Sequence, residues 1–199
     1  MPMDPIAIME QGGILMWPIF VCSLIALAIV LEKFVSLRRA DIDTREFMDT
    51  MRQVLRQNRT QEAVEICDET DAPVARIMKA GILKHNRPKE DIREAIEDAG
   101  RFEIPRLERY LSGLATCATV APMLGLFGTV GGMMVSFDRI AAAGQPRISD
   151  LAGGIRFALV TTYEGLLVAI PTTILYAVFR NRVARIAGDV ALLAEDLID

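Results

Sequence analysis

The amino-acid sequence predicts an all-α membrane protein with three transmembrane helices and an extended helical domain in the cytoplasm. Of its 199 residues 52% are apolar, and the mean hydropathy is +0.31. Residues 12–31 and 110–137 contain no charged side chain, and residues 157–179 contain only Glu164. A bilayer core about 30 Å thick needs roughly 20 mostly apolar residues per helix, so each of the three stretches is long enough to cross it.

The first apolar stretch is interpreted as a true span and not as a cleaved signal peptide. A signal peptide needs a basic region before its apolar core, whereas residues 1–13 carry only Asp4 and Glu10. The stretch ends in Glu32 and Lys33 without a small-residue cleavage pattern. We therefore expect this helix to remain in the membrane.

The distribution of Lys and Arg predicts the orientation of the chain. None precedes the first span, whereas Lys33, Arg38 and Arg39 follow it, which places the N-terminus outside and the C-terminus inside. Arginines of the C-terminal tail agree, but those of the second loop do not, so the direction of the third span depends on the first. The predicted order is a periplasmic N-terminus (1–13), a first span (14–31), a cytoplasmic helical domain (32–109), a second span (110–137), a periplasmic loop (138–156), a third span (157–179) and a cytoplasmic C-terminal helix (180–199).

The polar domain between the first two spans is predicted to be helical throughout. Residues 43–46 have the spacing of a capping box before an apolar residue pattern at helical intervals. Further helices are expected from Thr60, from Pro73 and from Pro88, because proline suits the first turn of a helix. We expect the last of these helices to run towards the second span with a bend near Pro105.

Small residues distinguish the second span from the first. Gly125, Gly128 and Gly132 are spaced three and four apart and so share one helical face. Such a face either packs against another helix of the same chain or lies against a partner or a pore. Pro122 in the second span and Pro171 in the third are each expected to kink their helix.

Polar groups within the third span are the candidates for ion transport. Glu164 lies eight residues into the apolar run, about 10 Å along the helix. A carboxylate inside the membrane costs roughly 2.5–3.5 kcal/mol on insertion scales, so Glu164 serves an ion pathway, a hydrogen bond with a neighbouring helix, or an ion pair with Arg156 or Arg139. Thr161 and Thr162 add hydroxyl groups two to three residues earlier.

Several classes of protein are excluded by composition. His85 is the only histidine, and neither a metal site nor a catalytic triad can be assembled around it. Three cysteines are too few for a disulfide scaffold. The net charge of −4 gives no indication of nucleic-acid binding. We therefore expect no enzyme, no cofactor and no nucleic-acid partner.

Two motifs resemble the signatures of the ExbB/TolQ/MotA proton-channel family. Residues 121–133 read Ala-Pro-Met-Leu-Gly-Leu-Phe-Gly-Thr-Val-Gly-Gly-Met. Residues 154–155 read Gly-Ile, residues 158–162 Ala-Leu-Val-Thr-Thr, and residues 165–171 Gly-Leu-Leu-Val-Ala-Ile-Pro. The size and the three-span layout resemble the ExbB/TolQ branch, since MotA-type proteins have four spans.

The resemblance implies a mechanism and a set of partners. Family members form a homopentamer in the bacterial inner membrane, whose second and third spans line a pore around a dimer of ExbD/TolR-like single-span helices. Proton flow drives rotation, and the partner transmits work to a TonB- or TolA-type protein. By motif position, Thr129 and Thr162 match the family's pore-lining threonines. Their hydroxyls can donate and accept hydrogen bonds, which suits the passage of a carboxyl group.

The acidic residue departs from the family pattern. ExbB-type members often carry a glutamate at the position of Phe157, whereas here the acid is Glu164, seven residues later. Seven residues turn a helix by about 700°, so both positions face the same side. We therefore interpret Glu164 as a replacement for that acid. It lies about 200° from Thr162, and it faces either the pore or a neighbouring subunit.

The leading hypothesis is an ExbB-type motor subunit that energises TonB-dependent outer-membrane transport. The alternatives are a TolQ-like role in envelope maintenance, a gliding-type motor, and a membrane scaffold that conducts no ions. Threonine oxygens can serve the passage of either H⁺ or Na⁺, so the sequence leaves both ions open as the coupling ion.

Overall fold

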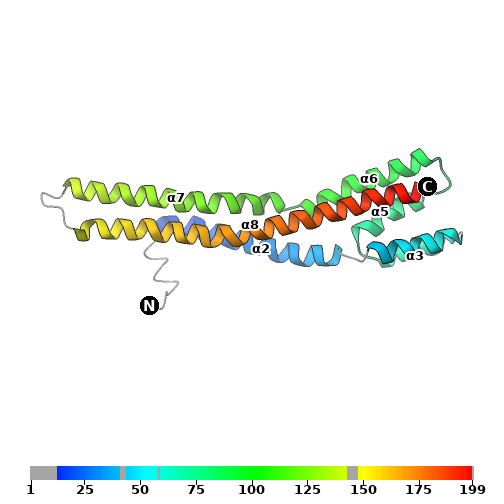
Figure 1. Ribbon diagram of the computed structural model, residues 1–199, viewed down its shortest axis with the longest axis horizontal. Helices are drawn as coiled ribbons and strands as arrows, with labels where there is room; N and C mark the ends of the chain where they lie inside the picture. The colour runs from blue at the N-terminus through cyan, green and yellow to red at the C-terminus, as the bar shows by residue number, and fades with distance from the viewer. Residues whose placement is uncertain (1–12, 41–43, 58, 143–147, 199) are drawn as a thin grey trace. The chain divides into compact units, whose positions relative to one another are not determined.

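The computed structural model describes residues 13–40, 44–57, 59–142 and 148–198, and these residues form helices connected by short turns (Figure 1). They contain no strand, and three of their helices are long and apolar enough to cross a membrane, which confirms the predicted fold class. The elements are listed here in chain order: η1 (Gly13–Leu15), α2 (Met16–Ala40), α3 (Thr44–Arg56), α4 (Thr60–Glu69), α5 (Pro73–Ile82), α6 (Lys89–Glu108), α7 (Leu111–Ala142) and α8 (Ile148–Ile198).

The chain divides into two compact units. The membrane unit comprises Met1–Val30 and Tyr110–Ala177, and the polar unit comprises Leu31–Arg109 and Val178–Asp199. Helices α2 and α8 each supply residues to both units. The candidate spans are Gly13–Arg38, Lys89–Ala142 and Leu151–Val190, and they contain the three apolar stretches of the sequence.

Helices α3 to α6 of the polar unit begin where the sequence predicts. α4 begins at Thr60, α5 at Pro73, and α6 at Lys89 directly after Pro88. Neighbouring helices pack in sequence order, α3 on α4, α4 on α5 and α5 on α6, around buried Met51, Ile77 and Ile96. The predicted capping box covers residues 43–46, and its first residue, Asp43, lies outside the described part of the chain.

The predicted bend near Pro105 of helix α6 stays a prediction. Pro105 lies inside a continuous helix, and the helix ends three residues later at Glu108. Tyr110 has a positive φ of 67°, a conformation that L-residues rarely adopt and that stops an α-helix. Tyr110 therefore separates α6 from α7.

Both long helices extend beyond the apolar stretches. α7 continues past Phe137 to Ala142, and α8 begins at Ile148 and runs unbroken to Ile198. Pro122 and Pro171 lie inside α7 and α8 without interrupting them, and the predicted kinks stay predictions. A change from apolar to polar residues ends a membrane span, but it does not by itself end a helix.

A buried lysine joins α2 to the end of α6 in the polar unit. Lys33 has no exposed surface, and its ammonium group donates a hydrogen bond of 3.0 Å to the carbonyl oxygen of Leu107. It also lies 3.4 Å from a carboxylate oxygen of Glu32. The carbonyls of the last helical turn have no partner within the helix, so Lys33 caps α6 from another element.

Two ionisable side chains of the polar unit, Arg76 and Cys67, have pKa values shifted by their surroundings. Arg76 of α5 lies 2.7 Å from Glu103 of α6 and 2.9 Å from Asp71, and Glu103 raises the pKa of the Arg76 guanidinium. Burial raises the pKa of the Cys67 thiol to about 11, so this thiol stays protonated at neutral pH. His85 is exposed.

Candidate functional site

The centre of the membrane unit is a close contact between α7 and α8, which run antiparallel and side by side (Figure 1). Gly125, Gly128 and Gly132 are all buried and face α8. A methyl group added at Gly125 would lie 2.9 Å from the backbone oxygen of Thr161. One added at Gly132 would lie 2.8 Å from that of Gly154. The glycine face therefore allows the two backbones to approach within the same chain.

Ser136 extends this glycine face, although it was not singled out from the sequence. It is 1% exposed, donates to the carbonyl of Gly132 over 2.9 Å, and occupies the space that a side chain at Gly154 would need. Its position four residues after Gly132 is the signal that could have identified it.

The two adjacent threonines of α8 occupy different places in this contact. Thr161 is completely buried against Gly128, and its hydroxyl donates to the carbonyl of Ala158 over 3.0 Å. Thr162 is half-buried, and its hydroxyl donates across to the carbonyl of Gly125 on α7 over 3.1 Å. Thr162 thus links the two helices at the edge of their contact.

Thr129 lies one helical turn beyond Gly125 on α7. It is half-buried, and its hydroxyl donates to the carbonyl of Leu126 over 2.6 Å. In both Thr129 and Thr162 the hydroxyl proton is engaged by a backbone carbonyl, so the oxygen lone pairs remain able to accept from a proton donor. We refer to Thr129 and Thr162 as the first threonine pair.

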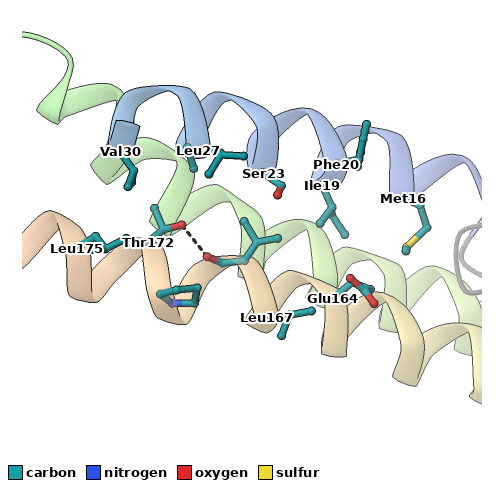
Figure 2. A pocket seen from close by; sticks show the side chains of 13 residues that line it. Met16, Ile19, Phe20, Ser23, Leu27, Val30, Glu164, Leu167, Thr172 and Leu175 are labelled. Carbon is teal, nitrogen blue, oxygen red and sulfur yellow. Dashed lines mark hydrogen bonds between the residues drawn. The ribbon is translucent and has the colours of Figure 1, made fainter. Parts of the chain in front are cut away.

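Glu164 points away from the first threonine pair, into a groove between α2 and α8 (Figure 2). The groove has a volume of about 310 Å³, and Met16, Ile19 and Phe20 of α2 lie opposite Glu164. Ser23 and Thr172 are the other polar residues among those that line it. The Thr172 hydroxyl donates to the carbonyl of Val168 over 2.6 Å, so the wall around the carboxyl group is mainly apolar.

Other contacts place α2 on the same side of the α7–α8 pair. Ile29 of α2 lies next to Gly113 of α7, and Cys22 of α2 lies near the thiol of Cys117 of α7. The Phe157 ring of α8 packs near Gly13, directly before α2. Thr162 lies about 200° around α8 from Glu164, and Thr129 about 120° around α7 from Cys117. The first threonine pair therefore lies on the side away from α2.

No group of three or more His, Cys, Asp or Glu side chains suited to a metal ion occurs within the ranges that the structure describes. Within the apolar stretches 110–137 and 157–179, the first threonine pair lies on one side of the packed glycine contact and Glu164 lies on the α2 side. This arrangement suits the passage of a proton or a small cation along hydroxyl oxygens.

Comparisons with known proteins match this chain to a family of proton channels. A family model described as the MotA/TolQ/ExbB proton channel family matches residues 69–191. An ExbB-like biopolymer transport protein of Synechocystis sp. is 31% identical over 172 residues, which cover 85% of this chain and 82% of that protein. The biopolymer transport protein ExbB of Neisseria meningitidis serogroup A is 29% identical over 96% of this chain and 93% of its own length. The Tol-Pal system protein TolQ of Pseudomonas aeruginosa is 34% identical over 64% of this chain and 60% of its own length.

Proteins of this family are inner-membrane proteins that energise transport and are not enzymes. ExbB and TolQ proteins work with ExbD- or TolR-like partners in membrane complexes. The three apolar helices agree with a location in the inner membrane. Because the family model covers more than half of the residues and the Synechocystis relative aligns with most of both sequences, the chain belongs to the MotA/TolQ/ExbB proton channel family.

Proposed function

We propose that this chain is the channel-forming subunit of an ExbB-type motor, which uses the proton motive force to energise TonB-dependent outer-membrane transport. The observation that carries the proposal is that Thr129 and Thr162 both lie at the edge of the α7–α8 contact, on the side away from α2. In a ring of copies, this side of the helix pair faces the axis, and α2 lies towards the lipid. The proposed assembly is a homopentamer with its N-terminus in the periplasm and its C-terminus in the cytoplasm.

The proposed partner within the ring is a dimer of an ExbD/TolR-like single-span protein, which passes force to a TonB-like protein. A carboxyl group on the partner helix would accept and release the transported proton. The outward lone pairs of the first threonine pair could accept a hydrogen bond from that carboxyl group in its protonated form. The chain's own residues thereby position the proton without binding a metal or a cofactor.

Replacing Thr162 with valine is expected to abolish most of the proton flux. Valine keeps the shape of threonine but removes the hydroxyl, so the link to the Gly125 carbonyl and the outward oxygen are both lost. The complex would be isolated from native membranes through a tag on this chain and reconstituted into liposomes with a pH-sensitive dye. Unchanged flux in both Thr162→Val and Thr129→Val complexes would rule out the channel and favour a scaffold without ion transport.

A glutamine at position 164 is expected to leave proton flux within about twofold of the unsubstituted complex. A substitution outside the ion pathway usually costs about 0.5 kcal/mol or less, which corresponds to a factor of about two. The reason is that Glu164 lies in the α2 groove, on the other side of α8 from Thr162. The same liposome assay measures this. A flux as low as that of Thr162→Val would instead place the carboxyl group in the ion pathway.

A TolQ-like role in envelope maintenance is the second candidate, supported by the 34% identity to TolQ of Pseudomonas aeruginosa. The phenotype of cells whose gene for this protein is deleted distinguishes the two roles. Loss of growth on a substrate that needs TonB-dependent import supports the ExbB-type role. Sensitivity to detergents with normal import supports the TolQ-like role.

A further inference from the structure

A second pair of threonines lies further along the same two helices, with Thr173 turned by about 20° from Thr162 and Thr119 by about 80° from Thr129. Thr119 of α7 and Thr173 of α8 are both exposed. Thr119 precedes Thr129 by ten residues, and Thr173 follows Thr162 by eleven. Because α7 and α8 are antiparallel, both displacements run in the same direction, by about 15 Å, towards the Leu111 end of α7.

Both members of the second pair face the side away from α2. Thr173 is two residues after Pro171, which lines the α2 groove, so it lies about 200° around α8 from that wall. Thr119 is two residues after Cys117, whose thiol lies near Cys22 of α2, so it is likewise about 200° away. This is the side on which Thr129 and Thr162 lie.

Both hydroxyl groups of the second pair donate within their own helix, as that of Thr129 does, whereas Thr162 donates across to α7. Thr119 donates to the carbonyl of Ala115 over 3.0 Å, and Thr173 donates to that of Ala169 over 2.8 Å. Each hydroxyl proton is therefore engaged within its own helix, and each oxygen presents only lone pairs outwards. Such a surface attracts hydronium or another small cation and offers nothing to an anion.

We propose that Thr119 and Thr173 form a second station of the ion pathway, which accepts hydronium on its way between the first threonine pair and the Leu111 end of α7. This inference rests on the proposed channel function, which supplies the water-filled ring that exposes these oxygens. Without such a ring the two threonines would face lipid, where hydroxyls bonded to their own backbone are tolerated and carry no ion.

Thr172 provides a matched control for Thr173. The two residues are adjacent, and each donates to the carbonyl four residues earlier, but Thr172 is 4% exposed and lines the α2 groove. In the liposome assay we expect Thr173→Val to lower proton flux about 3- to 10-fold, the range for loss of one hydrogen bond. We expect a further fall with Thr119→Val added, whereas Thr172→Val retains the flux per folded complex.

A Thr173→Ser variant separates hydroxyl chemistry from packing. It should keep the flux of the unsubstituted complex, and an equal loss in the Ser and Val variants would overturn the second station. Normal flux in the Thr119→Val/Thr173→Val double variant, alongside a loss in Thr162→Val, would also overturn it and leave the channel function intact. Normal flux in all of these variants would instead contradict the channel function itself. Sodium uptake that is lost in the same variants would support the station and identify its ion as Na⁺.

Discussion

An alanine at Gly132 is expected to destabilise the protein by about 1–3 kcal/mol, the usual cost of forcing an extra group into a packed contact. The added methyl group would lie 2.8 Å from the Gly154 carbonyl oxygen and 3.2 Å from the Ala158 nitrogen. Both are backbone atoms, so no side chain can rotate away and α7 must separate from α8. Thermal unfolding in detergent, followed by circular dichroism, should show a midpoint about 2–12 °C lower.

The adjacent Gly131 provides the control for this experiment. A methyl group at Gly131 meets no atom within 4 Å, so Gly131→Ala keeps the α7–α8 contact. It should leave the midpoint unchanged or raise it slightly, because alanine favours the helix over glycine by up to about 1 kcal/mol. Equal midpoints for the two variants would show that the glycine face is not what holds α7 against α8.

Truncation of Lys33 to alanine is expected to destabilise the protein by about 2–5 kcal/mol, the range for removal of a large buried side chain. The side chain is fully buried, and its loss leaves a cavity as well as a Leu107 carbonyl without the lysine. A methionine at this position would fill the cavity without restoring the hydrogen bond. The free energies of unfolding of the Ala and Met variants, measured by chemical denaturation, therefore separate the contribution of the buried lysine stem from that of its ammonium group.

Lys84 is the comparison for Lys33, because it is exposed in the same polar unit. Its replacement with alanine should change stability by no more than about 0.5 kcal/mol. If Lys33→Ala were equally harmless, the cap on α6 would have no role in stability.

Most of the fold could be predicted from the sequence because its signals are local. Uncharged runs of membrane length mark three helices, and Thr60, Pro73 and Pro88 mark the beginnings of the polar helices. The burial of Lys33 could not be predicted in this way, since its acceptor lies 74 residues later in the chain. The turn at Tyr110 was also missed, because tyrosine carries no preference for a positive φ.

The candidate site could be predicted only in part. Helical spacing separated Glu164 from Thr162, but it did not identify which of them faces α2. The reason is that α2 is apolar on all sides within its span, so its sequence marks no face for packing. Likewise, the glycine spacing fitted both an internal contact and a partner surface, and only the position of α8 distinguishes them.

The contacts that the glycine face of α7 makes with α8 join glycine, alanine, serine, threonine and phenylalanine, none of which carries an acid or base group that titrates near neutral pH. Acidification on one side of the bilayer therefore leaves their strength unchanged, although it would alter any carboxyl group that passes beside them. The packing of α7 on α8 can therefore stay the same while an ion passes. Gain and loss of a proton are then confined to the carboxyl group of the proposed partner helix.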